Sequence, residues 1–115
     1  MLQGHDHLVS KTNPIDSAGN PTSATSIIEG GIEYSIDPDG VIYLMNGPAG
    51  NQTREPYNPE ANESVLGTYY DYGVASKASS WAEFEVNGNA IKVTVRYIDL
   101  SGEVKNYYTW GIIKS

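Results

Sequence analysis

The sequence is 115 residues long, carries a formal net charge of −7 and contains no cysteine. The length suits one small domain, and the acidic balance argues against nucleic acid or an anionic membrane as a partner. The absence of cysteine excludes disulfides, thiol nucleophiles and zinc fingers, and leaves histidine and carboxylates as the possible metal ligands. No stretch approaches the ~20 apolar residues of a membrane span, and the first residues lack the pattern of a secretory signal.

The N-terminal part of the sequence mixes short apolar runs with turn residues. Residues 1–3 resemble the end of a strand, and residues 11–26, rich in Asn, Pro, Ser, Thr and Gly, predict a loop. Residues 32–36 alternate as a short strand would. Residues 37–40 (Asp-Pro-Asp-Gly) predict a turn, and the continuous apolar run 41–45 predicts a strand buried on both faces.

Residues 46–80 carry weaker signals. Two glycines and a proline in residues 46–51 indicate an irregular bend, and Pro56 and Pro59 break any helix. Because no periodicity extends through this region, we expect a long excursion that tyrosine side chains hold in place.

The C-terminal third shows clear strand patterning. Ala82, Phe84 and Val86 share one face of a predicted strand, and Glu83 and Glu85 share the other. The pair Asn87-Gly88 then predicts a type I′ hairpin turn. Beyond it, apolar and polar residues alternate again from 91 to 97, and residues 104–113 form a third predicted strand after a turn at 99–102. Residues 81–115 are therefore predicted to form a three-stranded antiparallel meander, with Glu83 and Glu85 facing Lys92 and Arg96.

A meander of this kind has one apolar face and cannot close on itself. That face and the apolar run 41–45 must cover something, so the sequence predicts half of a sandwich. The predicted fold class is mainly β, with little or no helix, and residues 1–115 are predicted to form a single partial domain.

The sharpest chemical signal is Gly4-His5-Asp6-His7, within a predicted motif loop over residues 1–12. Glycine permits a sharp backbone turn, and two imidazoles two residues apart can face neighbouring metal ions. These are the only histidines in the sequence, so any further ligands must come from carboxylates or from outside the chain. A chance histidine pair, or a remnant of a tag, is the competing interpretation of the motif alone.

With the residues that follow it, the motif resembles a known family. Gly4 to Thr12 (GHDHLVSKT) is similar to the last metal-binding motif of the calcineurin-like metallophosphoesterases, especially their purple acid phosphatase-like branch. Residues 40–50 and 81–113 resemble, in the same order, the strand and glycine-rich loop and the closing strands of that family. Val9 and Lys11 stand where the branch often has an aromatic residue and arginine, which puts phosphate contacts from these two positions in doubt.

The resemblance implies a function, and it also implies that this chain cannot perform that function by itself. His5 would ligate one metal and His7 the other in a binuclear Fe, Zn or Mn centre, which activates water to hydrolyse a small phosphate ester; no role is carried onto Asp6. The upstream motifs, which supply the bridging carboxylate, have no counterpart here. The chain is therefore expected to be inactive alone, to need the remainder of the phosphoesterase domain as a partner, and to derive from a secreted or cell-surface parent protein.

A different class of function remains open from the sequence. Nine tyrosines and the acidic charge also suit a stand-alone β-sheet module for binding or adhesion, without catalysis, in which the histidine pair is incidental.

Overall fold

A computed structural model describes residues 1–3, 9–46, 66–71, 79–99 and 101–115. Within these ranges the chain forms β-strands and no helix, which confirms the mainly β fold class. None of the described segments therefore qualifies as a helix able to cross a membrane.

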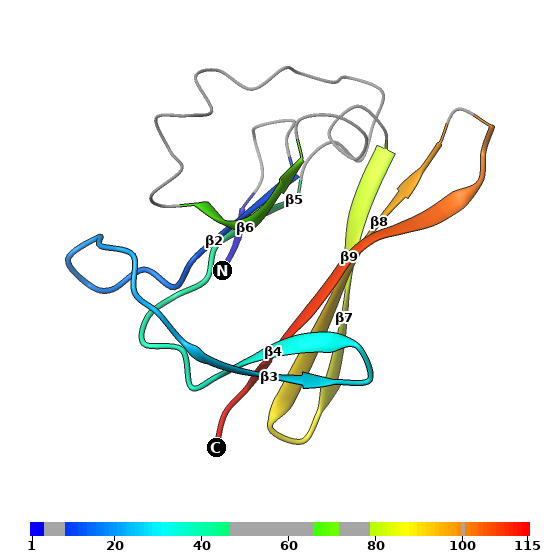
Figure 1. The fold of residues 1–115 in the computed structure, drawn as a ribbon. Coiled ribbons are helices and arrows are strands. Elements are labelled where there is room, and N and C mark those ends of the chain that lie inside the picture. Colours follow the sequence, from blue (N-terminus) through cyan, green and yellow to red (C-terminus); the bar gives the residue numbers. More distant parts are fainter. Residues whose placement is uncertain (4–8, 47–65, 72–78, 100) are drawn as a thin grey trace.

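The strands form two sheets that lie on opposite sides of a shared core (Figure 1). The smaller sheet has the order β1–β5–β2–β6, with β1 Leu2–Gln3, β5 Leu44–Asn46, β2 Val9–Thr12 and β6 Leu66–Asp71. The larger sheet has the order β3–β4–β9–β8–β7, with β3 Thr25–Glu29, β4 Ile32–Ile36, β9 Val104–Ile113, β8 Ala90–Ile98 and β7 Ser79–Asn87.

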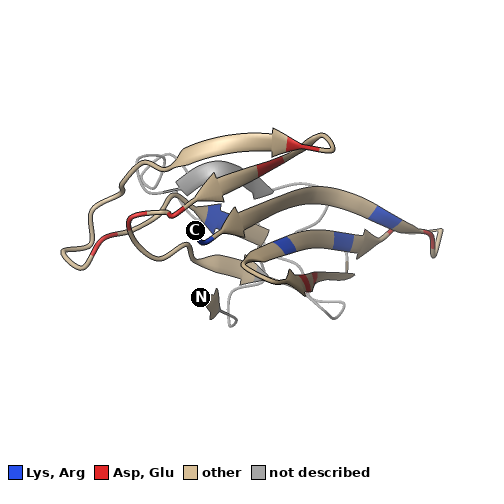
Figure 2. Ribbon diagram, turned by 90° about the horizontal axis from the view of Figure 1, so that it is seen from below, with Lys and Arg blue, Asp and Glu red and all other residues tan. Residues whose placement is uncertain are grey.

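The predicted meander is present as β7–β8–β9, antiparallel throughout. Two ion pairs cross its outer face, Lys92 Nζ to Glu85 Oε2 at 2.7 Å and Arg96 Nε to Glu83 Oε2 at 3.0 Å. The second is close in distance but poorly aligned, since Arg96 Nε has no hydrogen-bond partner within the described ranges. Figure 2 shows the basic residues of β8 beside the acidic residues of β7.

The hairpin turn between β7 and β8 differs in type from the prediction. Asn87 pairs with Ala90, so the two central residues are Gly88 and Asn89. Gly88 has φ +60°, whereas Asp37 alone among the described non-glycine residues has a positive φ. A single positive φ at the first central position is the type II′ pattern, and the predicted type I′ turn is wrong. Two positive φ values in succession occur instead in the β3–β4 hairpin, at Gly30 and Gly31.

Two of the regions predicted to lack regular structure, residues 11–26 and 46–80, contain strand. Lys11 and Thr12 belong to β2, and Thr25 and Ser26 belong to β3. Strand β6 lies in the region where the sequence shows no periodicity. For β2 and β6 the reason is pairing over long sequence separations: β2 is bonded to β5 on one side and to β6 on the other, and the local sequence pattern does not record such partners. Thr25 and Ser26 pair instead within the β3–β4 hairpin.

The apolar run 41–45 is buried on one face rather than two. Ile42 and Leu44 are 5% and 2% exposed, whereas Val41 is 42% exposed and Tyr43 and Met45 are half-buried. Only residues 44 and 45 of the run are in β5, and Val41 makes an isolated bridge to Ile15. The larger sheet covers only one face of this segment, so the run alternates as an ordinary sandwich strand does.

The core lies between the two sheets, and this corrects the expectation that the sequence forms only half of a sandwich. Three core residues come from the smaller sheet and from the segment that leads into β5 (Val9, Ile42 and Leu44). The other three come from the larger sheet (Val93, Val95 and Trp110). Burial of each such side chain contributes roughly 2 kcal/mol. The cover is incomplete, however: Phe84, Val86 and Ile91, on the same face of the larger sheet, remain 44%, 72% and 37% exposed.

Candidate functional site

The two predicted metal ligands, His5 and His7, lie outside the described residues, as does most of the motif to which they belong. The structure does describe the strands on either side of the motif. Strand β1 ends at Gln3 and strand β2 begins at Val9, and β5 lies between these two strands in the smaller sheet. The predicted motif loop over residues 1–12 is therefore wrong for residues 2–3 and 9–12, which are strand because they pair with β5 and β6.

Four strand termini meet at one end of the smaller sheet. Val9 at the start of β2 is the partner of Asn46 at the end of β5, and also of Asp71 at the end of β6. Strand β1 runs parallel to β5, so its end at Gln3 lies at the same end of the sheet. Hydrogen bonds on both sides of β2 fix the backbone at the point where the motif joins it, and strands position functional groups more accurately than free loops do.

No group of three or more His, Cys, Asp or Glu side chains that would hold a metal ion occurs within residues 1–3, 9–46, 66–71, 79–99 and 101–115. The carboxylates with lowered pKa accept hydrogen bonds from a turn and from the last residue of the chain instead. Asp99 Oδ1 accepts hydrogen bonds from Ser101 and from Glu103 N, and these bonds hold the pKa of Asp99 well below its ordinary value. Asp37 accepts bonds from Ser115, which lower the pKa of Asp37 in the same way.

A second feature, unforeseen from the sequence, is a lysine inside the sandwich. Lys11 is two residues after Val9 on β2, so both side chains point to the same side of the sheet, and Lys11 is only 9% exposed. Its Nζ lies 4.9 Å from the centroid of the Trp110 ring on β9. A desolvated cation over an indole face gains about 2 kcal/mol. Burial lowers the pKa of Lys11, and the nearby Glu33 carboxylate opposes that shift in part.

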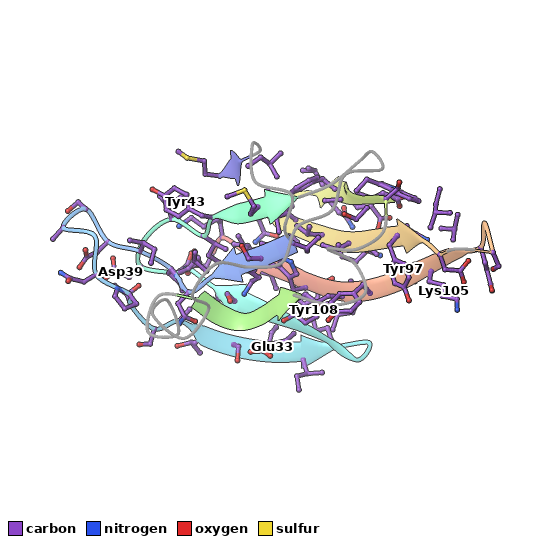
Figure 3. All side chains as sticks on the ribbon, turned by 90° about the horizontal axis from the view of Figure 1, so that it is seen from above. Glu33, Asp39, Tyr43, Tyr97, Lys105 and Tyr108 are labelled. Atoms are coloured by element: carbon purple, nitrogen blue, oxygen red, sulfur yellow. The ribbon has the colours of Figure 1, made fainter. Side chains whose placement is uncertain are left out.

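Lys11 lines two adjoining cavities between the sheets. The larger, of about 350 Å³, is partly open to solvent and lined mainly by small polar residues and by Pro14, Ala24 and Ile42. The smaller, of about 30 Å³, is lined by Lys11, Glu33, Ser35, Tyr108, Trp110 and Gly111. The two cavities share Lys11, Glu33 and Ser35. Figure 3 shows Glu33 and Tyr108 near one another in this part of the molecule.

Trp110 leaves a polar atom unsatisfied beside the smaller cavity. Its side chain is 5% exposed, and its Nε1 has no hydrogen-bond partner within the described ranges. Lys11 Nζ forms no ion pair with any described carboxylate. A buried donor without an acceptor costs about 1–3 kcal/mol, so the Trp110 indole N–H, with the Lys11 cation beside it, marks a place suited to an acceptor.

Lys11 is also where the motif departs from the phosphoesterase pattern. Its side chain packs against Trp110 between the sheets, so the structure assigns this position a place in the interior. The alternation of Val9 and Lys11 along a strand is the sequence signal for this burial, but the composition of residues 11–26 predicts a loop there. Trp110, Glu33 and Ser35 had no such signal.

Comparison with protein-family models, with curated proteins and with solved structures gave no match to this chain.

Proposed function

We propose that this chain is the C-terminal part of a calcineurin-like metallophosphoesterase of the purple acid phosphatase-like branch, in which His5 and His7 each ligate one metal of a binuclear centre. The observation that supports the proposal concerns the strands next to the motif in the sequence: β1 ends and β2 begins at the end of the sheet where β5 and β6 also terminate. Metal sites need ligands held by a rigid backbone, and β2 is bonded on both sides.

The uncovered apolar surface supports the same proposal. Phe84, Val86 and Ile91 continue the core face of the larger sheet beyond the edge of the smaller one. A domain that extends upstream of the motif would cover this surface, because contiguous exposed apolar patches usually mark an interface. We therefore assign the remainder of the phosphoesterase domain as the partner of this surface.

The metals would supply the chemistry, by lowering the pKa of a bound water and neutralising the charge of a phosphate ester. This chain contributes two imidazoles to that centre, and its described residues add no cluster of carboxylates. The bridging ligand must then come from the upstream part of the domain, so the chain by itself is inactive. The substrate class is a small phosphate ester, and the parent protein is secreted or displayed at the cell surface.

The test is to express the chain in one polypeptide with the region encoded upstream and to measure hydrolysis of p-nitrophenyl phosphate with added Mn²⁺, Zn²⁺ or Fe²⁺. His5→Ala and His7→Ala should each lower kcat/KM by about 100-fold or more, since even residues that only support a metal ligand cost 10- to 100-fold. Asp6→Asn is the matched control, because Asp6 lies between the two histidines and has no assigned role.

Full activity in both histidine variants would show that the metal assignment is wrong. An equal loss in Asp6→Asn would show that the motif matters for folding rather than for metal binding. A stop codon and ribosome-binding site immediately upstream of Met1 would remove the parent domain from consideration.

A specific observation also favours the second candidate, an independent β-sheet module that binds or adheres without catalysis. The chain forms both layers of a sandwich and buries a core between them, as an independently folding domain does. Thermal unfolding of the chain alone separates the candidates. A cooperative, monomeric transition without metal favours the module, whereas aggregation or partial order favours a part of a larger domain.

A further inference from the structure

We propose that the cavity between the two sheets binds a small organic monocarboxylate, with Lys11 and Trp110 as the groups that hold the carboxylate. This proposal uses none of the residues assigned to metal binding and does not depend on the phosphoesterase proposal. It begins from a buried indole N–H of Trp110 that has no acceptor within the described ranges, and from the largely buried Lys11 beside it, whose ammonium pairs with no described carboxylate.

A carboxylate matches these two donors in number and in charge. It has two oxygens, so one can accept from Lys11 Nζ and the other from Trp110 Nε1–H. Both residues line the same cavity of about 30 Å³, which has room for about two water-sized groups. One negative charge also neutralises the one buried cation, and hydrogen bonds with a charged partner are the stronger ones.

Glu33 narrows the class of ligand. It lies close enough to Lys11 to favour the charged ammonium and lines both cavities. A dianion such as phosphate would place a second negative charge near this carboxylate, and like charges in a partly buried site repel. The site is therefore suited to a monoanion.

The larger cavity accommodates the rest of the ligand. Its volume of about 350 Å³ lies within the range of small-molecule sites. Pro14, Ala24 and Ile42 supply apolar wall, and Ser23, Ser26 and Ser35 supply hydroxyl groups. A short aliphatic chain of about three to five carbons, with or without a hydroxyl, would contact this wall while its carboxylate lies in the smaller cavity.

The experiment uses the fluorescence of Trp110. The sequence has two tryptophans, so Trp81→Phe leaves Trp110 as the single indole. Trp81 lines neither cavity. In this background, butanoate should give a saturable change in emission and shift the NMR signal of the Trp110 indole N–H, whereas butanamide, which has the same shape without the charge, should give neither. Phosphate should bind more weakly than butanoate.

Lys11→Met should weaken butanoate binding by about tenfold or more, the loss expected for a hydrogen bond to a charged group. Lys92→Met is the matched control on the outer face of the larger sheet, and it should leave binding unchanged. Glu33→Gln should strengthen binding, because it removes the repelling charge. That variant tests the site even if Lys11→Met were to perturb the fold.

Equal responses to butanoate and butanamide, an unchanged affinity in Lys11→Met, or a lack of any saturable response would each overturn the proposal. In the last case the smaller cavity would hold water alone. A preference for phosphate over butanoate would also overturn it, because Glu33 would then not select the charge of the ligand.

Discussion

The ring of Tyr34 on β4 lies directly over Gly111 on β9, its partner in the parallel ladder between the two strands. A Cβ at position 111 would overlap Cδ1 and Cε1 of the Tyr34 ring and would lie 2.8 Å from the carbonyl oxygen of Ile91. Glycine therefore makes room for an aromatic side chain on the outer face of the larger sheet. This contact helps to attach the β3–β4 hairpin to the meander.

Gly111→Ala should destabilise the chain by about 2 kcal/mol, in the range typical of overpacking. Urea unfolding followed by circular dichroism would measure the loss. The same substitution in a Tyr34→Ala background should cost less, because the ring is no longer in the way. An identical cost in both backgrounds would show that Ile91, and not Tyr34, determines the need for glycine.

A second glycine is required by both space and backbone conformation. Gly40 has φ +135°, and a Cβ there would overlap the carbonyl oxygen of Ile15 and lie 2.7 Å from its carbonyl carbon. Because the obstacle is backbone, it cannot rotate away, and Gly40→Ala should cost about 2–3 kcal/mol. Gly19→Ala is the control: its φ is +86° but nothing lies within 4 Å of the new Cβ, so only the conformational cost of about 1 kcal/mol applies. Comparison of the two urea midpoints checks the difference.

The meander was predictable because its signals are local. Alternation from Ala82 to Val86 and the turn residues near Gly88 specify two paired strands without reference to the rest of the chain. The outer-face ion pairs follow from the same alternation. Only the turn type was wrong, because the sequence does not show which residue of the Asn-Gly-Asn run begins the turn.

The strand pairing of the smaller sheet could not be predicted, because its pairs join distant segments. Leu2 pairs with Leu44, and Ser10 pairs with Tyr70, and no local pattern records such partners. The two candidate sites differ in the same respect, since one depends on a local sequence motif and the other on a contact between distant segments. The histidine pair is visible as a motif, whereas the contact between Lys11 and Trp110 exists only once the two sheets have come together.

The turn after β8 should make the stability of the chain depend on pH in the acid range. Bonds from Ser101 and Glu103, and Lys105 Nζ at 3.1 Å, lower the pKa of Asp99 below its ordinary 3.8. A carboxyl whose folded-state pKa is lowered contributes stability above its unfolded-state pKa and loses it as the pH falls through the folded-state value. Asp99→Asn should thus be less stable than the unmodified chain above pH 3.8, and the difference should shrink as the pH falls below 3.8. Urea unfolding at a series of pH values measures it; a difference independent of pH would contradict the role of the charge.

The charge of the buried Lys11 should have the opposite effect and lower the free energy of unfolding at neutral pH. Burial lowers the folded-state pKa of Lys11 below its ordinary 10.5, so between these two values the unfolded chain binds more protons and stability rises with pH. Below the folded-state pKa the full cost of burying the cation is present. Lys11→Met keeps the side chain's length and removes that charge, and it should raise the free energy of unfolding at neutral pH by about 1 kcal/mol. The gain should diminish as the pH approaches 10.5, because the unmodified chain then buries a neutral amine. Lys114→Met, at an exposed position, should show no comparable pH dependence. If Lys11→Met instead destabilises the chain at neutral pH, the contact with the Trp110 ring outweighs the cost of burial.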